Sequence, residues 1–355
     1  MTDLKKIICM VLCVSLLLFM CACSKDDGSA VLSYKSGTKT VCSLDSSFMY
    51  FWISVQKSVY TTVAAAYENG WEQVVDEQNG TTLCDLLMTE SEESAKKLLV
   101  IEYLHDNVYK LKLSDEQKDS VNSQIQNLVS RYGSENALNT KLSQFGADKN
   151  TLSRYYELML KQNNLYECFY GENGKFPVSD ENKKQYFKDN YSIADHIFFN
   201  TDASGQTDTD SETLAETKRE IAENVYERIK NAGEDFDTLK AQYNEDSFAQ
   251  NYYPYGFFVT NDSTFPAEFT SAVLTMNAGD ITMVETPGTG IHIIRELAMD
   301  ENLYNAYDSV LQNITDTLCA EDFAQRIGEY TDNVDANRAA MDSYDPMLIP
   351  EFALD

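Results

Sequence analysis

The sequence predicts an α+β protein with a mostly helical N-terminal region, a small antiparallel sheet surrounded by helices, and a closing C-terminal helix. Three observations predict this class. A length of 355 residues is enough for two folded units. Helix-capping patterns and apolar residues at helical spacing fill the first half of the chain. Short apolar runs typical of strands begin only near residue 191.

Composition excludes several classes of protein. Apolar residues make up 43% of the chain, which is enough to build a core and excludes a wholly disordered protein. Fifty-seven acidic residues against 28 basic ones leave a formal charge of −29, so a nucleic-acid partner would be repelled. Only three histidines are present, and the cysteine spacings match no zinc motif. We therefore expect no nucleic-acid partner, no metal site and no cofactor.

The first 22 residues have the pattern of an export signal. Lys5 and Lys6 precede an uncharged stretch at 7–20, and Cys21-Ala22-Cys23-Ser24 follows. Fourteen helical residues rise about 21 Å, which is short of the ~30 Å hydrocarbon core of a membrane. The pattern resembles a bacterial lipoprotein signal, in which Cys23 would become the lipidated first residue and anchor the protein. Plain secretion with cleavage nearby is the alternative.

Residues 23–45 contain few large apolar side chains at their start, and we expect them to form a tether. Four cysteines remain beyond the signal, at positions 42, 84, 168 and 319. One or two disulfides could form in an oxidising compartment, and buried free thiols are the alternative.

Residues 46–191 have a helical pattern. Thr89-Glu90-Ser91-Glu92 and Ser114-Asp115-Glu116-Gln117 have the spacing of capping boxes, and each precedes apolar residues at helical intervals. Gly133 is placed to end the second of these helices. Further helices are predicted near 151–170 and 180–190.

The pattern changes at residue 191. Residues 193–199 form a short apolar run typical of a buried strand. Helices are predicted at 214–232, 236–243 and 269–276, followed by a hairpin of 281–284 and 291–297. Residues 299–345 return to a helical pattern, and the last ten residues, 346–355, are expected to be a loose tail.

Five motifs in residues 193–297 together resemble the parvulin family of peptidyl-prolyl isomerases. They are Ala194-Asp195-His196-Ile197, Tyr243-Asn244-Glu245-Asp246-Ser247, Phe265-Pro266-Ala267-Glu268-Phe269, Ala278-Gly279-Asp280-Ile281 and Gly290-Ile291-His292-Ile293-Ile294. The resemblance implies a parvulin domain at 192–298, inserted into a helical chaperone domain of 46–191 that is completed by 299–345. This arrangement, together with the signal, resembles the PrsA/SurA-type extracytoplasmic foldases.

The resemblance also implies a site. His196, His292, Asp246 and Thr289 match a polar network beneath the X-Pro bond, and Phe265, Phe269 and Tyr255 match an apolar cup for the prolyl ring. Rotation about this bond needs no acid–base step, so Asp246 is expected to polarise the amide surroundings and not to act as a nucleophile. The expected partners are unfolded or partly folded secreted proteins, on the extracytoplasmic face of a bacterial membrane. The sequence does not decide the oligomeric state, and a homodimer is one alternative.

Two features bear on the function. The loop Tyr252-Tyr253-Pro254-Tyr255-Gly256-Phe257-Phe258 stands where parvulins have a glycine-rich turn. This departure supports a second hypothesis, a holdase chaperone with a weak or inactive parvulin domain.

Residues 200–217 contain five acidic and no basic residues, which disfavours clients phosphorylated before proline. A solute-binding lipoprotein is disfavoured because it would need two alternating α/β lobes, and the N-terminal half of this chain has a helical pattern throughout.

Overall fold

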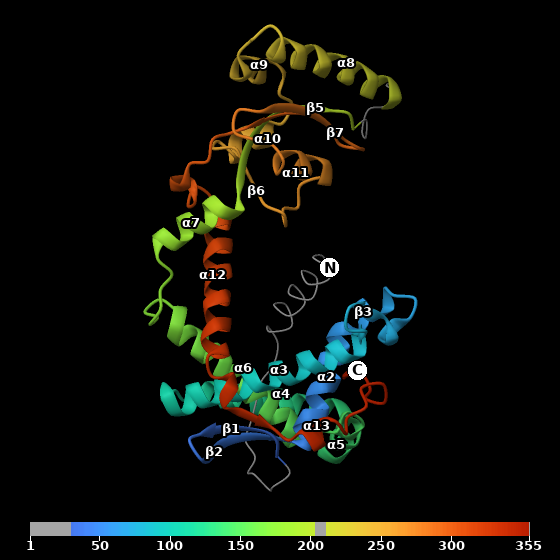
Figure 1. Ribbon diagram of the computed structural model, residues 1–355, viewed down its shortest axis with the longest axis vertical. Coiled ribbons are helices and arrows are strands. Elements are labelled where there is room, and N and C mark those ends of the chain that lie inside the picture. The colour runs from blue at the N-terminus through green and yellow to red at the C-terminus, as the bar shows by residue number, and fades with distance from the viewer. Residues whose placement is uncertain (1–29, 203–210, 355) are drawn as a thin grey trace. The chain divides into compact units, whose positions relative to one another are not determined.

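A computed structural model describes residues 30–202 and 211–354, and the chain forms two compact units. The first unit runs to Pro177 and resumes at Glu321, and the second is Val178–Ala320 (Figure 1). The predicted signal, Cys23 and loop residues 203–210 lie outside the described residues. Within the described ranges, no helix has the length and apolar character needed to cross a membrane.

In the described part of the first unit, five helices between Ser46 and Tyr170 carry most of the main apolar core. The core includes Phe48, Leu99, Leu158 and Phe169, each with 1% of its surface exposed or less. A two-stranded ribbon, a π-helical turn and two 3-10 turns connect these helices. Their bounds are α2 (Ser46–Ala65), η1 (Gly70–Glu72), β3 (Val74–Asp76), β4 (Thr81–Thr82), α3 (Leu83–Tyr103), η2 (Leu104–Val108), α4 (Asp115–Tyr132), α5 (Glu135–Leu142), η3 (Ser143–Phe145) and α6 (Lys149–Tyr170).

Of the two predicted capping boxes, one is confirmed and one is wrong. Ser114 and Gln117 form the predicted capping box at the start of α4, and Gly133 ends that helix with a left-handed φ of 87°. The predicted box at Thr89 is wrong, because Thr89 lies inside α3. Thr82 and Asp85 form the box instead and start the helix seven residues earlier than Thr89. Both threonines have suitable spacing, so local sequence could not separate them.

The predicted tether is also wrong over much of its length. Residues 30–45 form the hairpin β1 (Ala30–Ser36) and β2 (Lys39–Asp45), and β1 also pairs with β9 (Val334–Ala336). Val31, Leu32 and Tyr34 on β1 are each 2% exposed or less. The partner strand is about 300 residues away in the sequence. A strand completed by such a distant partner leaves no local signal.

The last ten residues are not a loose tail over the described part. Ile349 is 2% exposed, and the ring of Phe352 lies 5.1 Å from that of Phe51. Ser54 Oγ donates to the carbonyl of Pro350, and the N–H of Phe352 donates to the carbonyl of Ser54. These contacts follow the 3-10 turn η5 (Thr331–Asn333) and the short helix α13 (Arg338–Met341). The segment packs without regular structure, which hydrophobic periodicity cannot detect.

A four-stranded antiparallel sheet with the order β6-β5-β8-β7 is the centre of the second unit. The sequence predicted three of these strands. The fourth, β6, has only three residues and lies at one edge, beside β5. The bounds are β5 (Ser192–Asn200), β6 (Phe257–Val259), β7 (Ile281–Thr286) and β8 (Gly290–Glu296).

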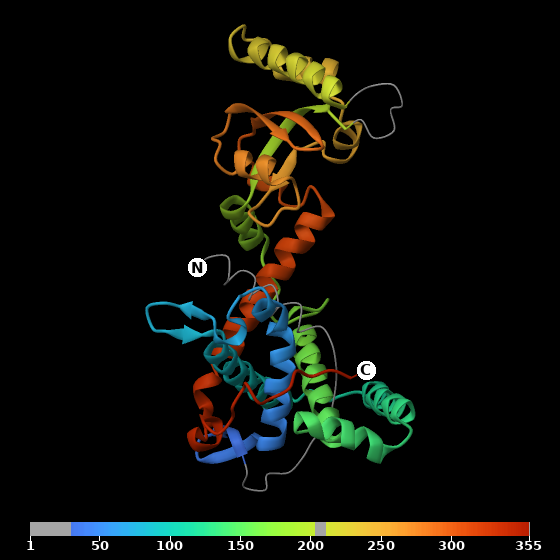
Figure 2. The ribbon, with the colours of Figure 1, turned by 90° about the vertical axis from the view of Figure 1, so that its right-hand side faces the viewer.

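Helices cover both faces of this sheet (Figures 1 and 2). On one face, Ala222, Val225 and Ile229 pack against Ile197 and Ile293 of the sheet. On the other, Phe269 and Val273 pack against Ala194 and Ile294. The first face carries α8 (Ser211–Lys230) and α9 (Phe236–Tyr243), and the second carries α10 (Ser247–Tyr252) and α11 (Ala267–Val273).

The division between the units differs from the predicted boundaries. Helix α7 (Asp180–Asn190) belongs to the second unit, because Phe187 packs with Ile193 and Phe258. Helix α12 (Asp308–Gly328), preceded by η4 (Glu301–Leu303), contributes to two cores. Its residue Ile314 packs in the second unit, and Phe323 and Ile327 belong to the core of the first unit. Helical periodicity identifies both elements but not the core that each one joins.

Candidate functional site

His196 and His292 lie in contact on one face of the sheet. They stand on the adjacent strands β5 and β8, where His196 pairs with Ile294 and His292 pairs with Phe198. Because side chains alternate along a strand, both rings point to the face covered by α10 and α11. Their Nδ1 atoms are 3.1 Å apart, and the residues are 3% and 6% exposed. The structure thus joins two of the predicted site residues.

Thr286, and not Thr289, contacts this pair. The Oγ1 atom of Thr286 lies 3.2 Å from Nε2 of His292, and Thr286 is 1% exposed. Thr289 is exposed in the turn between β7 and β8, so its predicted place in the network is wrong. Thr286 pairs with Gly290, which puts it on the same sheet face as His292. The sequence placed a threonine near the end of this hairpin but could not fix the turn register.

These contacts assign the protons of the network. The hydroxyl of Thr286 donates to the carbonyl of Gly290 at 3.0 Å, so its oxygen accepts from the Nε2–H of His292. Nδ1 of His292 is then the acceptor, and the Nδ1–H of His196 donates to it. Burial, followed by the neighbouring His196, lowers the pKa of His292 to about 3. His292 is therefore neutral at physiological pH.

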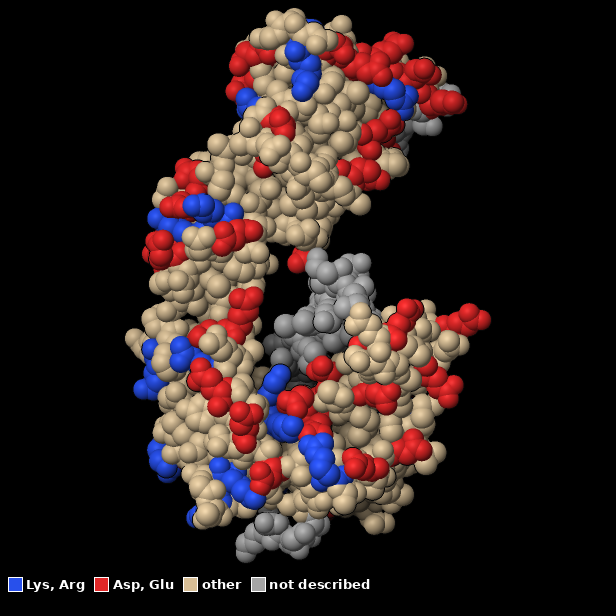
Figure 3. All heavy atoms as spheres, viewed as in Figure 1, with Lys and Arg blue, Asp and Glu red and all other residues tan. Residues whose placement is uncertain are grey.

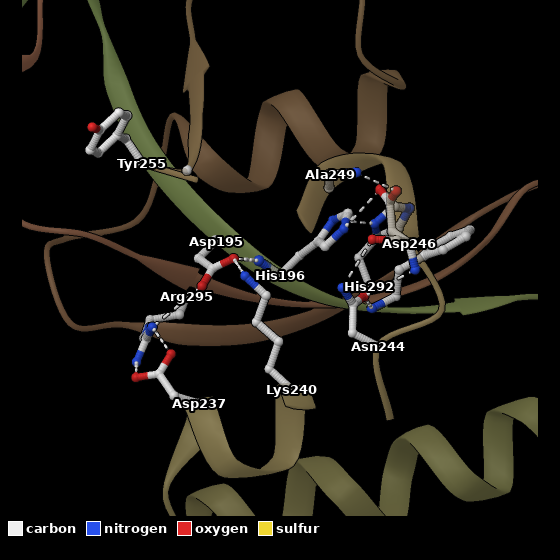
Figure 4. Close-up of polar contacts among 12 residues, drawn as sticks. Asp195, His196, Asp237, Lys240, Asn244, Asp246, Ala249, Tyr255, His292 and Arg295 are labelled. Carbon is white, nitrogen blue, oxygen red and sulfur yellow. Dashed lines mark hydrogen bonds and ion pairs between the residues drawn. The ribbon is translucent and has the colours of Figure 1, made fainter. Parts of the chain in front are cut away.

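Asp246 completes the network at the surface. Its Oδ2 lies 3.2 Å from Nε2 of His196, and its side chain is 24% exposed against 4% for the imidazole. Nε2 of His196 makes no hydrogen bond of good geometry within the described chain, so the contact is a close approach of an imidazole nitrogen and a carboxylate oxygen. The His196 ring lowers the pKa of Asp246 below its usual range, against the effect of burial. Asp246 thus keeps a partly exposed carboxylate beside His196, and Figure 4 shows the two side chains together.

A short stretch before α10 fixes the position of Asp246. The Oδ1 of Asn244 accepts the N–H of Phe198 at 2.8 Å, and the N–H of Glu245 donates to the carbonyl of Phe198 at 2.9 Å. Asp246 also caps α10 by accepting the N–H of Ala249 at 2.8 Å. The backbone around Asp246 is therefore bonded to β5 on one side and to a helix on the other.

Aromatic rings surround the two histidines. The ring of Phe269 lies 5.3 Å from that of His292, and the ring of Phe257 lies 4.7 Å from that of His196. Phe265 is half-buried and lies 5.5 Å from Phe257. The structure thus places predicted Phe265 and Phe269 at the site and adds Phe257. The sequence could have identified Phe257, because it is the aromatic residue directly after Gly256 in the aromatic loop.

Residues 180–299 match the family of the PPIC-type PPIase domain. Residues 180–299 of the second unit form a parvulin-type peptidyl-prolyl isomerase domain. No curated protein matches the chain. Among solved structures, PrsA from Bacillus subtilis is 18% identical, with 78% of this chain and 94% of that chain covered and a TM-score of 0.24. Peptidylprolyl isomerase (PrsA) from Bacillus cereus is 20% identical, with 78% and 93% covered and a TM-score of 0.26. Foldase protein PrsA from Lactococcus lactis is 14% identical, with 89% and 96% covered and a TM-score of 0.26.

The aromatic loop of the PPIase domain leaves the polar network intact. Gly256 has a φ of 93°, and a Cβ atom there would lie 2.8 Å from the carbonyl oxygen of Ala194, so this position needs glycine. Tyr255 is 50% exposed and its ring contacts Tyr307, away from the histidines (Figure 4). Its predicted place in the prolyl cup is wrong, because the turn at Gly256 directs Phe257 inward instead.

An ionic cluster occupies the opposite face of the sheet in the PPIase domain. Arg295 reaches both Asp195, at 3.4 Å, and Asp237, at 2.7 Å, and its guanidinium lies 4.2 Å from the centre of the Phe236 ring. Asp195 Oδ1 also accepts the N–H of His196 at 2.8 Å. This cluster supports the backbone of the first histidine and does not face the substrate side (Figure 4).

In residues 30–202 and 211–354, no group of three or more His, Cys, Asp and Glu side chains is arranged to hold a metal ion. Cys42, Cys84 and Cys168 are free thiols, and burial raises the pKa of Cys84.

Proposed function

We propose that the chain is a membrane-anchored foldase that isomerises X-Pro bonds in secreted proteins outside the cytoplasm. The observation that carries the proposal is the network of Asp246, His196 and His292. It places an accessible carboxylate beside two buried imidazoles whose Nδ1 atoms are 3.1 Å apart.

The chemistry follows from the electronic structure of the amide. Partial double-bond character gives the C–N bond a rotation barrier of about 18–20 kcal/mol. That resonance places negative charge on the carbonyl oxygen, and rotation removes it. A fixed carboxylate near this oxygen disfavours the planar, charge-separated form more than the twisted one. Asp246 has the required exposure and is expected to supply this carboxylate.

The histidines and the aromatic rings prepare the site for this step. His292 is neutral and is held by Thr286, so it keeps His196 oriented toward Asp246 without placing a charge in the apolar interior. Phe257, Phe265 and Phe269 supply apolar surface for the prolyl ring. Removing water from the amide also lowers the barrier, because the planar form is more polar than the twisted one.

The cellular setting rests on the sequence. The basic start, the apolar stretch and Ala22-Cys23 support a lipid anchor at Cys23, and lipidation would hold the domains outside the membrane. Unfolded chains arriving there are the proposed clients. Mass spectrometry of the mature N-terminus tests the anchor: a diacylated Cys23 supports it, and an unmodified start elsewhere contradicts it.

A protease-coupled assay of the full chain on an Ala-Pro tetrapeptide tests the isomerase. Asp246→Asn retains a good helix cap and removes the charge, so it should lower kcat/KM by about tenfold or more while α10 stays folded. Asp262→Asn changes an exposed acid of the same unit and should leave kcat/KM unchanged. Full activity in Asp246→Asn would contradict the proposed role of the carboxylate.

A holdase is the second candidate, and the first unit favours it. That unit has its own core and a surface hollow of about 450 Å³. The hollow is lined by Leu111, Lys112, Asn164, Glu167, Cys168, Asn173 and Lys175. A holdase would suppress aggregation of an unfolded client equally well in the full chain and in Asp246→Asn. Loss of suppression in that variant would count against a separate holdase function.

A further inference from the structure

Two aromatic side chains of α10 lie exposed beside the site. Phe248 is 60% exposed and Tyr252 is 62% exposed, and their rings stack with centroids 4.4 Å apart and planes 29° apart. They stand four residues apart and therefore share one side of the helix. We refer to Phe248 and Tyr252 as the aromatic shelf. Neither ring is needed by the network that contains Asp246.

The shelf is continuous with the aromatic wall of the prolyl site. The ring of Tyr253 lies 6.1 Å from Phe248 and 5.1 Å from Phe257, which itself lies 4.7 Å from His196. The shelf also begins two residues after Asp246. A polypeptide bound at Asp246 would therefore pass close to the shelf as it leaves the site.

Charge identifies the chemistry of the occupant. Two acidic residues, Glu245 and Asp246, precede the shelf, and Glu245 is paired with Lys218. On the face of the second unit shown in Figure 3, acidic side chains gather over α8 and α9, and the area over α10 and α11 is mostly uncharged. An anionic segment at the shelf would be repelled by the carboxylate of Asp246. A neutral aromatic side chain would gain a stacking partner and cover apolar surface.

We propose that Phe248 and Tyr252 form a second client subsite, which takes an aromatic side chain close in sequence to the isomerised proline. An extended chain rises about 3.3 Å per residue, and ring contacts of 6.1 and 5.1 Å separate Phe248 from Phe257 by no more than their sum, so the interval corresponds to about three residues or fewer. The subsite would make the enzyme selective for aromatic-flanked prolines in unfolded chains. This inference deepens the proposed isomerase function and rests on it.

Peptide binding to the full chain tests the subsite independently of turnover. The probes are blocked alanine peptides with one proline, in which a single Phe or a single Glu is placed at each neighbouring position. Kd is measured by calorimetry. A Phe within about three residues on one side of the proline should bind about three- to tenfold more tightly than Ala. A Glu at the same position should bind more weakly than Ala.

Variants assign this preference to the shelf. The Phe248→Ser/Tyr252→Ser double variant should bind Phe and Ala peptides equally, and Phe248→Leu should lose part of the preference while keeping an apolar surface. Tyr255→Ser removes another exposed ring, which contacts Tyr307 instead, and it should keep the preference. Circular dichroism of each variant checks that the fold is retained.

Three outcomes would overturn the subsite. They are equal Kd values for Phe and Ala peptides in the unchanged protein, a preference that survives in the double variant, and a dimer that the double variant dissociates in sedimentation. The last would assign the shelf to a second copy of the chain. Isomerisation is measured on the same peptides. A protein that binds with the Phe preference but does not isomerise would contradict the proposed function and leave the subsite standing.

Discussion

Thr286 Oγ1 lies 3.2 Å from Nε2 of His292, on the neighbouring strand of one hairpin. Because this hydroxyl gives its proton to the carbonyl of Gly290, it can only accept from the imidazole. The protonation of His292, the donor role of His196 and the exposed contact with Asp246 all follow from that constraint. The buried hydroxyl of Thr286 thus fixes the hydrogen-bond directions of the network through the rings of His292 and His196.

Thr286→Val should lower both activity and stability. Valine has nearly the same shape but cannot accept the buried Nε2–H of His292, which costs about 1–3 kcal/mol of unfolding free energy. His292 is then free to adopt the other tautomer, and kcat/KM should fall severalfold. Urea unfolding and the coupled isomerase assay measure the two effects.

Thr289→Val is the matched control, because the same change is made three residues away in the exposed turn. It should leave both quantities within error. Equal losses in the two variants would show that the hairpin, and not the Thr286 hydroxyl, determines the effect.

His292 should make the PPIase domain sensitive to acid. Its pKa is lowered from 6.5 to about 3, so between these values the unfolded chain binds a proton that the folded domain does not. The stabilisation is complete above about pH 6.5 and is lost as the pH falls toward 3. Each unit of pKa shift corresponds to about 1.4 kcal/mol, so the loss amounts to a few kcal/mol.

The difference in unfolding free energy between the unchanged protein and His292→Gln isolates this group. That difference should rise with pH between about 3 and 6.5 and be constant above. A difference that does not vary with pH would contradict the buried neutral imidazole.

Glu296 should have the opposite pH dependence. Burial raises its pKa from 4.5 to about 7, and its Oε2 has no hydrogen-bond partner among the described residues. The folded domain then binds the extra proton, so the contribution of Glu296 to stability is present below pH 4.5 and is lost as the pH rises through 7. Glu296→Gln should therefore raise Tm more at pH 8 than at pH 4.

Glu268→Gln serves as the exposed control on α11 and should leave the Tm difference between the two pH values unchanged. If Glu296→Gln lowered Tm at pH 8, the charged carboxylate would be stabilising, and the proposed direction would be wrong.

Residues with a local signal were predictable, and those that depend on distant partners were not. Strand alternation and family motifs identified His196, His292 and Asp246, because each motif is contiguous. Thr286 was missed because only the turn register distinguishes it from Thr289. Tyr255 was placed wrongly because, across the left-handed turn at Gly256, Phe257 and not Tyr255 packs against His196. The hairpin at 30–45 depends on β9, whose pairing no local pattern reveals.

Deleting residues 346–355 should destabilise the first unit and leave the isomerase activity unchanged. The buried ammonium of Lys57 donates to the carbonyls of Pro346 at 2.8 Å and Ile349 at 2.7 Å, and the deletion would leave it without these acceptors. Together with the lost packing of Phe352 against Phe51, the expected cost is about 2–5 kcal/mol. Calorimetry should show a lower Tm for one transition, while kcat/KM on the tetrapeptide stays unchanged, because Asp246 and both site histidines belong to the other unit. An unchanged Tm would mean that the segment is loosely held, as the sequence alone had predicted.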